Sequence, residues 1–523
     1  MSETASPGSA AGDPTRRAVY VICALWVALL LTWTLLLPTY RSADEYHHVS
    51  AAIALGETHS WPGYKRLLHV EQVLATRDSA GYRTERAPGE GNYYPLPADG
   101  AEPREARSPF LQRGEVVELG AMNVIGQHPP GYYAILAVVD KALPSGTSYT
   151  STVWAFRLVS VLLMAPLPWL LAATARRLGA DPPAVVATAI VPFLIPQLGA
   201  LGGAVNNDNL LIAACAVLAW LSARIATGDL SARTAVGTGL ALAVALLAKA
   251  WGLLFVPVLV AAYVLAAVRG RTWRVPVLRL VTVGSLSLLG AWWWVRNVLV
   301  FGQLQPAGHT RHLDVPLGVR EAIGPYTREA LELIPLRFWA TLSVKPGSPF
   351  APAVTWVLSL ILVAAIVLFL IRRRSFLATR ADALLLMAPL MLCVVVLITS
   401  TWELYLATGR PRGLQGRYFY AGLIGIGAAI GLGVMATVPA RFRRLAATAL
   451  AASGAVFIGF STARAIEFHY AGDAWERLSS LVAWGPTPPG LTYLILALGA
   501  LAVLVLPVVV HRSLRPARGE PDR

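Results

Sequence analysis

Long, uninterrupted apolar runs recur along this chain from position 19 to position 510. A helix needs roughly 20 consecutive apolar residues to cross a hydrocarbon core of about 30 Å, and these runs have that length. The strands of a membrane barrel would instead alternate apolar and polar residues over about ten positions. Hydrophobic residues make up 56% of the 523 positions and charged residues only 14%. The sequence therefore predicts an all-α, polytopic transmembrane helical bundle.

Arginine clusters between the apolar runs predict the orientation of this bundle. Short cytoplasmic loops of membrane proteins are rich in Lys and Arg, and placing the clusters inside gives about twelve alternating spans with both termini in the cytoplasm. The clusters are Arg16 and Arg17, Arg176 and Arg177, Arg224, the stretch from Arg269, Arg372 to Arg374, and the stretch from Arg441. The predicted spans lie near 19–40, 152–174, 182–203, 208–226, 233–248, 250–268, 276–300, 351–371, 381–402, 417–438, 445–463 and 490–510.

The apolar segment 131–143 is too short to cross a membrane comfortably, and we predict that it is re-entrant or interfacial. A thirteen-span alternative, in which it crosses, stays open. A stretch near 471–484 is predicted to form an amphipathic helix on the membrane surface. The predicted organisation is a disordered cytoplasmic tail (1–18), a first transmembrane helix (19–40), an extracytoplasmic loop (41–130), a transmembrane core (131–301), a second extracytoplasmic loop (302–350), C-terminal transmembrane helices (351–510) and a cytoplasmic tail (511–523).

Charge and cysteine content argue against several other classes of protein. The net charge of +15 comes mostly from cations clustered between the spans, which is the positive-inside pattern rather than a nucleic-acid-binding surface. The three cysteines lie inside apolar runs without CxxC spacing, so we expect neither a disulfide framework nor a cysteine metal site. His309 and His312 have a spacing that a metal could use, but no further Cys or His lies nearby, and no metal is predicted.

Two adjacent carboxylates follow the first predicted span. Asp44 and Glu45 lie one turn beyond its outer end, in the stretch TYRSADEYHH that starts at Thr39. A carboxylate held at the membrane boundary can accept a proton from an attacking hydroxyl group. Alternatively, Ser42 or Asp44 caps the helix that follows. The two interpretations are compatible, because a capped helix start would hold a base rigidly.

Two further polar stretches are predicted to lie at the same boundary. In GQHPPGYY, the prolines end one helix and begin another, which places His128 and Tyr132 near the outer surface. His128 is either a hydrogen-bonded structural residue or part of a catalytic site. In GGAVNNDNLL, Asn207 and Asp208 join two predicted spans. Asp208 either caps the helix that follows or binds sugar hydroxyls and positions a base.

Five cationic side chains lie on the side of the membrane where few are expected. Short outer loops should be poor in Lys and Arg, so we favour a bound anion as the explanation. Arg offers forked donors to phosphate, and Lys offers a point charge. The alternative is snorkelling, or pairing with Glu403. The five residues are Lys249, Arg296, Arg410, Arg412 and Arg417.

These stretches, in this order and on one predicted side, resemble the GT-C superfamily of membrane glycosyltransferases that use polyprenyl-phosphate sugars. The bacterial relatives of protein O-mannosyltransferases and aminoarabinose transferases are the most similar branch. The resemblance covers about residues 40 to 440 and implies that Asp44, with Glu45 beside it, is the catalytic base. A departure is that Ala43, rather than the more usual Pro, precedes the acid pair. No large soluble domain follows the last predicted span, which leaves acceptor recognition to the outer loops.

Further positions match the motifs of this superfamily one by one. Arg157, in WAFRLVSVLL, matches an Arg early in a span, and Lys249 matches a Lys that opens a span. Arg417 and Tyr418 match a Gly-Arg-Tyr stretch. With the residues named above, the resemblance implies a donor-phosphate site formed by Lys249, Arg296, Arg410, Arg412 and Arg417. It also implies a sugar or acceptor site formed by His128, Tyr132, Arg157, Asn207, Asp208 and Tyr418.

The activity implied by the resemblance is inverting glycosyl transfer at the extracytoplasmic face of a bacterial plasma (inner) membrane. The donor would be a polyprenyl-phosphate sugar, and the acceptor hydroxyl would belong to a cell-envelope glycan, a glycolipid or a protein, with no cofactor or metal required. One alternative is a transporter or flippase of lipid-linked saccharides, which would place ionisable residues in the middle of its spans. Another is a polymerase or ligase of lipid-linked oligosaccharides, which would hold a diphosphate.

Overall fold

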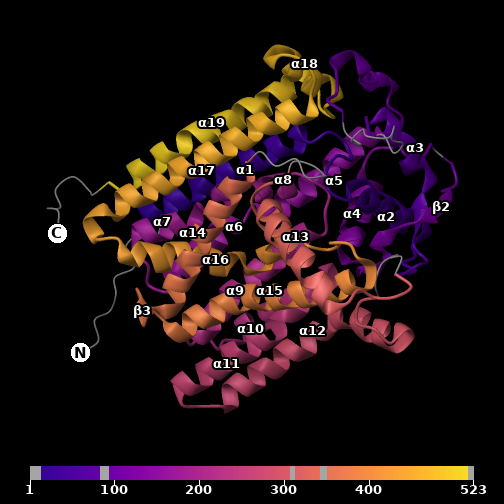
Figure 1. Cartoon of the computed structure of the whole chain (residues 1–523). Helices are drawn as coiled ribbons and strands as arrows, with labels where there is room; N and C mark the ends of the chain where they lie inside the picture. The colour runs from indigo at the N-terminus through magenta and orange to yellow at the C-terminus, as the bar shows by residue number, and fades with distance from the viewer. Residues whose placement is uncertain (1–12, 83–93, 113, 307–312, 342–349, 516–523) are drawn as a thin grey trace.

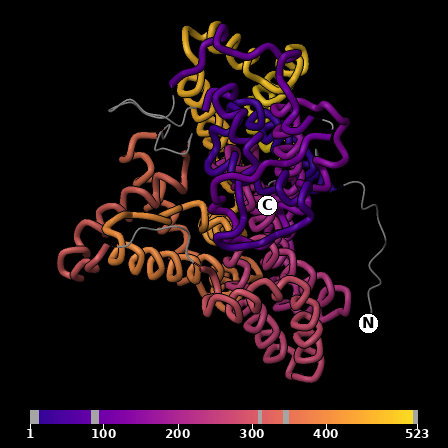
Figure 2. Tube along the Cα trace, turned by 90° about the vertical axis from the view of Figure 1, so that its right-hand side faces the viewer, coloured from indigo at the N-terminus to yellow at the C-terminus, as the bar shows by residue number. Residues whose placement is uncertain are grey.

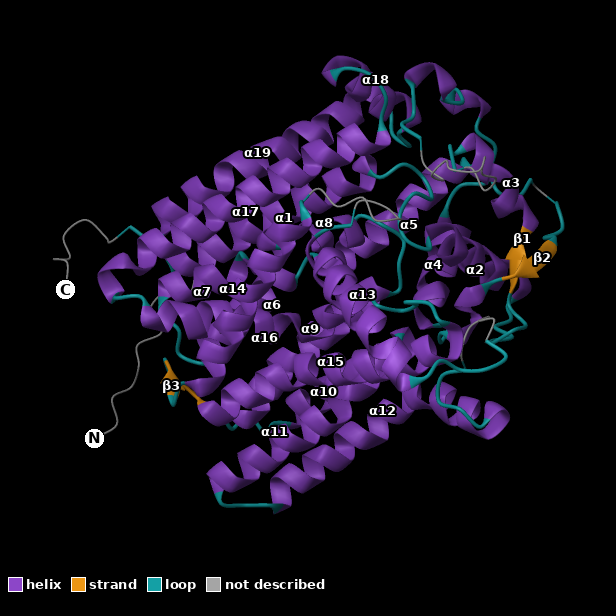
Figure 3. Ribbon diagram, viewed as in Figure 1, coloured by secondary structure: helices purple, strands orange, loops and turns teal. Residues whose placement is uncertain are grey.

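The computed structural model describes residues 13–82, 94–112, 114–306, 313–341 and 350–515, and within these ranges it is almost entirely helical (Figures 1 and 3). The predicted all-α, polytopic bundle is confirmed. Of the predicted cytoplasmic tail, residues 1–12 lie outside the described residues. Two short antiparallel hairpins complete the fold: β1 (Leu68–Val70) pairs with β2 (Leu119–Met122), and β3 (Arg374–Ser375) pairs with β4 (Ala378–Thr379).

Among the described residues, ten helical segments are long and apolar enough to cross a membrane. Seven of them are single helices: α1 (Pro14–Leu36), α9 (Asp208–Ala226), α12 (Arg274–Phe301), α14 (Pro352–Ile371), α15 (Arg380–Thr408), α17 (Ala440–His469) and α19 (Pro489–Ser513). The other three are composite: α5 (Tyr149–Met164) with α6 (Leu167–Arg177), the 3₁₀ helix η5 (Ala250–Leu254) with α11 (Phe255–Gly270), and Gly416–Thr437, which contains η6 (Gly416–Gly422), α16 (Leu423–Ala428), the π-helical η7 (Ala429–Val434) and η8 (Met435–Thr437).

The two remaining predicted spans are helical but shorter. Residues 182–203 form α7 (Pro182–Ala189), the 3₁₀ turn η4 (Val191–Leu194) and α8 (Pro196–Gly202). Proline lacks an amide hydrogen and clashes with the preceding turn, so Pro192 and Pro196 account for these breaks. The helix α10 (Ala232–Ala248) covers the other segment. Each of the twelve predicted spans therefore corresponds to a helical segment.

Shorter helices gather mainly at one end of the bundle, around α2 and α4 (Figure 1). The segment 131–143 contains the 12-residue α4, which packs against α2; whether it enters the membrane stays a prediction. Figure 2 shows the first long loop beside the C-terminal segment that contains α18, and Trp484 Nε1 donates to the Pro97 carbonyl at 2.8 Å. These shorter elements are α2 (Glu45–Thr58), α3 (Glu71–Ser79), η1 (Ala98–Gly100), η2 (Arg104–Ala106), η3 (Val124–Gln127), α4 (Gly131–Ala142), α13 (Val319–Trp339) and α18 (Ala474–Trp484).

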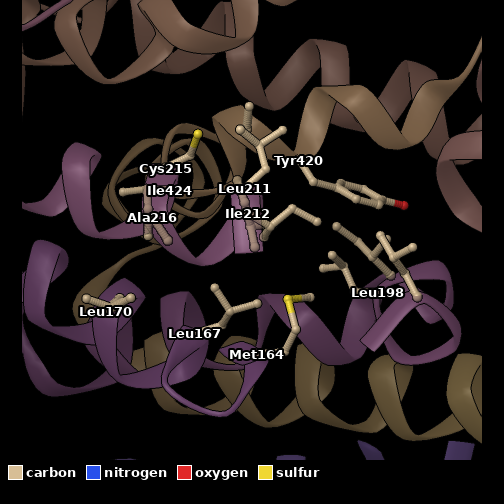
Figure 4. Close-up of a cluster of buried hydrophobic side chains, with 14 of the residues drawn as sticks. Met164, Leu167, Leu170, Leu198, Leu211, Ile212, Cys215, Ala216, Tyr420 and Ile424 are labelled. Atoms are coloured by element: carbon tan, nitrogen blue, oxygen red, sulfur yellow. The ribbon is translucent and has the colours of Figure 1, made fainter. Parts of the chain in front are cut away.

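The centre of the bundle is an apolar core contributed by distant parts of the chain. Figure 4 shows side chains of α5 and α6 facing those of α9 and of the 416–428 segment, among them Met164, Leu211 and Ile424. Elsewhere α10 and α12 approach so closely that a Cβ on Gly290 would overlap the Ala243 carbonyl. Small residues at such contacts are typical of helix packing in membranes. This packing fixes the ends of α9, α10 and η6 relative to one another.

The arginine clusters that were predicted to be cytoplasmic meet at the end of the bundle where α1 begins and α19 ends. Arg176 pairs with Asp13, Arg443 with Asp181, and Arg444 hydrogen-bonds His511. At the same end, Arg269 joins the α11 terminus to Asp382 at the start of α15. The predicted positive-inside loops are therefore neighbours in space. Their assignment to the cytoplasm stays a prediction, as do the predicted loop boundaries.

Candidate functional site

Asp44 lies at the N-cap position of α2, but its side chain makes no capping hydrogen bond. The expectation that its carboxylate caps this helix is therefore wrong. Its backbone is left-handed, with φ of 60°, a conformation that Asp tolerates better than most residues. Because the carboxylate makes no capping hydrogen bond, it is available to other groups.

The Asp44 carboxylate lies in a cavity at the end of the bundle where α2 starts. Its Oδ2 is 3.4 Å from Arg417 Nη2, and its side chain is 44% exposed. That exposed surface contributes to the wall of the cavity, which has a volume of about 80 Å³. The lining residues are Leu37, Ser42, Ala43, Asp44, Gln197, Ala200, Leu201, Arg337, Thr341, Gln415 and Arg417.

Glu45 has a different environment from its neighbour and is completely buried. Arg157 on α5 donates from Nε to one carboxylate oxygen at 2.9 Å and from Nη2 to the other at 2.6 Å. The backbone amides of Tyr40 and Val205 complete the shell, at 2.9 and 3.0 Å. Arg157 also donates to the carbonyls of Thr34, Leu37 and Pro38 at the end of α1. With all of these contacts satisfied, the geometry favours a structural role for both residues over the predicted catalytic role of Glu45 and the predicted sugar or acceptor contact of Arg157.

Asp208 brings together two of the predicted cations. Its Oδ1 accepts from Lys249 Nζ at 2.7 Å, and its Oδ2 lies 3.2 Å from Arg417 Nε. Lys249 occupies the break between α10 and η5, where extended backbone points its side chain toward α9, and it is only 5% exposed. The structure thus places Asp44, Arg417, Asp208 and Lys249 in one continuous chain of opposite charges.

Aromatic and amide groups surround this chain of charges. Lys249 Nζ lies 4.5 Å from the centre of the Tyr418 ring, a cation–π arrangement. Asn207 Nδ2 donates to the Ala248 carbonyl at 3.2 Å, which ties the start of α9 to the residue before Lys249. Tyr132 Oη accepts from the Asn206 amide at 3.1 Å. Asn207 and Tyr132 therefore hold the turn that carries Asp208, and sugar binding by them stays a prediction.

Two histidines lie close to the charged chain. His128 is buried in the loop before α4, and its Nδ1 has no hydrogen-bond partner among the described residues. Burial and the charge of Lys249 hold the pKa of His128 well below its ordinary value. His48, one turn along α2 from Asp44, bonds Tyr133 Oη through Nδ1 at 3.0 Å. Burial lowers the pKa of His48 to about 3, so both imidazoles are neutral at physiological pH.

The ionisation of Asp44 is set by two opposing effects. Burial raises the pKa of its carboxyl, but the charge of Arg417, with a smaller contribution from that of Lys249, lowers it more. The pKa of Asp44 therefore lies below its ordinary value. Asp44 is a carboxylate at neutral pH and has the charge state that a proton acceptor needs.

The other predicted phosphate ligands, Arg296, Arg410 and Arg412, are not among the residues that line the cavity. Arg296 stacks on Trp293 and Phe301, at 5.1 and 5.8 Å from the ring centres. Arg410 and Arg412 are exposed in the loop after α15. His309 and His312 lie outside the described residues, and the described part of the chain contains no group of three or more His, Cys, Asp or Glu placed to hold a metal.

Sequence reasoning missed several residues of the site. Gln197, Arg337 and Gln415 line the cavity but come from a broken helix, from the second long loop and from the loop before η6. His48 was also missed, although its position one turn after Asp44 on a helix was a usable signal. Arg337 gave no such signal, because nothing in the sequence shows that α13 packs against the 414–420 segment.

Comparison with known proteins gives one match to a family. Residues 127–294 match the family described as dolichyl-phosphate-mannose-protein mannosyltransferase. This region contains His128, Asp208 and Lys249 but not Asp44 or Arg417. A comparison with curated proteins found no match.

Solved structures show only distant similarity. ArnT from Cupriavidus metallidurans, in a structure bound to undecaprenyl phosphate, is 14% identical, with 94% of this chain and 75% of that chain covered and a TM-score of 0.45. The Archaeoglobus fulgidus oligosaccharyltransferase tethered with an acceptor peptide is 11% identical, with 88% and 56% covered and a TM-score of 0.43. The family match over residues 127–294 confirms the predicted resemblance to GT-C enzymes, and with it the predicted class of enzyme, a membrane glycosyltransferase.

Proposed function

We propose that this chain transfers a sugar from a polyprenyl-phosphate donor to an acceptor hydroxyl at the extracytoplasmic face of a bacterial plasma membrane. The observation that carries the proposal is the convergence of Asp44, Arg417, Asp208 and Lys249 beside a cavity at one end of the bundle. The matching family takes its name from a donor of this kind, dolichyl-phosphate-mannose. The acceptor would be a cell-envelope glycan, a glycolipid or a protein.

In the proposed reaction, the Asp44 carboxylate removes the proton of the acceptor hydroxyl. The acceptor oxygen bonds to the anomeric carbon while the bond from that carbon to the phosphate oxygen breaks. The electron pair of the broken bond stays on the phosphate, which leaves as polyprenyl phosphate. Attack opposite the leaving group inverts the anomeric configuration. Arg417 and Lys249 stabilise the charge that develops on the leaving oxygen.

Asp208 has a different role in this proposal from Asp44. Both of its oxygens face cations, and it is buried. Asp208 therefore positions Lys249 and Arg417 and partly neutralises them until the donor arrives. The Asp44 to Arg417 contact, at 3.4 Å, is the longest ion pair in the chain of charges. We propose that it is the contact that yields when donor phosphate binds.

The test compares the lipids of cells that lack the protein with those of complemented cells. Loss of a transferase should make one polyprenyl-phosphate sugar accumulate, and the wild-type chain should remove it. Asp44→Asn should leave the lipid accumulated, although the variant is expressed at the same level with the same melting temperature. Asp99→Asn, an exposed carboxylate of the same loop, is the matched control and should behave as wild type.

Two outcomes would contradict the proposal. An Asp44→Asn variant that clears the lipid as fast as wild type would remove Asp44 as the base. Accumulation of a lipid-linked diphosphate saccharide instead would favour the polymerase or ligase alternative.

A further inference from the structure

Arg337 is a cation of the cavity that belongs to none of the ion pairs described above. It lies in the last turn of α13, a helix that is not among the candidate spans. Together with Asp44 and Arg417 it lines the cavity. Its Nη1 donates to the Leu414 carbonyl at 2.7 Å, which uses one of the five N–H donors of a guanidinium.

The packing of α13 on the 414–420 segment holds Arg337 in place. A Cβ on Gly416 would overlap the Ile334 carbonyl, so only glycine allows this approach. Tyr420 Oη donates to the Phe338 carbonyl, and the rings of Phe338 and Tyr420 lie 5.2 Å apart. The residue after Arg337 is thus bonded to the segment that carries Arg417, which fixes the positions of these two cavity-lining arginines relative to each other.

The charged side chains in and beside the cavity carry one more positive charge than negative charge, and Arg337 is the source of this excess. Lys249 and Arg417 are paired with Asp208 and Asp44. Among the described residues, no carboxylate lies within ion-pair distance of Arg337, which is half-buried. Burial and then the charge of Arg417 lower the pKa of Arg337. Two cations placed together at a half-buried site favour an anion between them.

We propose that Arg337 binds the phosphate of the donor lipid together with Arg417, and so adds a ligand to the proposed phosphate site. The proposal rests on the transferase function proposed above. A monophosphate diester carries one negative charge, which matches the single uncompensated cation, whereas a diphosphate diester carries two. The cavity is therefore charge-matched to a monophosphate donor.

The same balance holds as the reaction proceeds. When Asp44 takes the proton of the acceptor, its carboxyl becomes neutral and no longer offsets the charge of Arg417. At the same step the departing phosphate changes from a monoanion to a dianion. One negative charge has thus passed from the Asp44 carboxylate to the phosphate, which the two guanidinium groups bind. The total charge of the cavity is therefore the same in the donor-bound and product states.

A structural role is the competing explanation for Arg337. A cation in the last turn of a helix interacts favourably with the helix dipole, and this one also bonds a carbonyl. Such a role predicts a loss of stability in variants but no loss of phosphate recognition at temperatures where the protein is folded. Binding and melting temperature therefore have to be measured on the same samples.

The experiment measures binding of polyprenyl phosphate and of polyprenyl alcohol to the full-length chain in lipid nanodiscs. A charge-assisted hydrogen bond to an ion predicts that Arg337→Gln weakens polyprenyl phosphate binding by about tenfold or more. Its affinity for the alcohol should stay unchanged. Arg337→Lys should lose less, because it keeps the charge. The matched control is Arg328→Gln, an exposed arginine of the same helix, which should bind both lipids as wild type does.

The outcomes separate this inference from the proposed function. Equal binding of phosphate lipid by wild type and Arg337→Gln would overturn the inference, as would a lower melting temperature with intact binding. The sugar of a donor can itself carry a carboxylate. If Arg337→Gln lost affinity only for such a donor and not for polyprenyl phosphate, Arg337 would bind the sugar, and the phosphate assignment would also be overturned. Failure of the wild-type chain to prefer phosphate over alcohol would instead contradict the proposed function itself.

Discussion

Asp44 and Glu45 are neighbours in sequence, yet the structure gives them opposite environments. Glu45 is fully buried, and its carboxylate accepts from one guanidinium and two backbone amides. Asp44 has one long contact to Arg417 and borders the cavity. A saturated carboxylate has no free lone pair directed at a substrate, whereas one with a single long contact can change partners. The comparison shows how one acid can hold a site together while the next performs chemistry.

The largest expected effect is on stability, from the Glu45 to Arg157 pair. Glu45→Gln should lower the free energy of unfolding by about 3–5 kcal/mol, because Arg157 would be left as an uncompensated buried charge. Glu57→Gln, a change on the same helix as Glu45, breaks an exposed ion pair with Lys141 of α4 and should cost no more than about 1 kcal/mol. Denaturation of the purified variants in detergent measures both. Equal losses for the two variants would break the distinction between Glu45 and a surface carboxylate.

The second effect concerns Asp208, which is buried as Glu45 is and lies beside Arg417 as Asp44 does. Asp208→Asn leaves Lys249 without its carboxylate partner, at a cost of about 3 kcal/mol. An anion that binds between the cations should replace the missing charge. Polyprenyl phosphate should therefore raise the melting temperature of Asp208→Asn by more than it raises that of wild type. An equal increase for both proteins would show that Asp208 and the lipid do not compete for the same cations.

Much of the fold followed from the sequence because the membrane imposes a strong rule on helix length and charge. The apolar runs located each span, and the arginine clusters located the end of the bundle that Arg176, Arg269 and Arg443 share. Breaks at Pro192 and Pro196 altered the form of one span but not its position. Each of these features is visible within a short stretch of sequence, so one amino-acid sequence was enough to predict them.

The site was only partly predictable, because its details depend on tertiary contacts. Asp44, Lys249 and Arg417 stood out as charges near span ends, and the structure brings them together. The sequence could not distinguish Asp44 from Glu45, since which of them meets Arg157 depends on how α1, α2 and α5 pack. For the same reason it could not separate Arg417 from Arg410, or show that Arg337 lines the cavity.

The third prediction concerns the pH dependence of activity, which depends on the ionisation of Asp44. Because the folded pKa of Asp44 is lowered, the base stays ionised, and activity should persist, down to about pH 4, the ordinary pKa of Asp. By linkage, the stability that this group contributes is present above its unfolded pKa and is lost as pH falls through the lower folded pKa.

Arg417→Gln removes the largest opposing charge and leaves burial to raise the pKa of Asp44. The acidic limb of donor consumption in proteoliposomes should then move to higher pH. Arg417→Lys keeps a charge and should keep the limb near its wild-type position. A limb that stays in place in Arg417→Gln would mean that a group other than Asp44 sets it.

The smallest effect is expected for Arg410. Its size shows whether exposed cations contribute to polyprenyl phosphate binding as buried cations do. Arg410 and Arg417 lie seven positions apart, but Arg410 is exposed and Arg417 is buried beside two carboxylates. In water an exposed charge contributes little to a fixed contact, so Arg410→Gln should change polyprenyl phosphate affinity by less than about twofold. A loss as large as that of Arg417→Gln, and one that disappears at high salt, would show that the loop attracts the lipid at long range. In that case recognition would not be confined to the cavity, and burial would be the wrong criterion for selecting phosphate ligands among the outer cations.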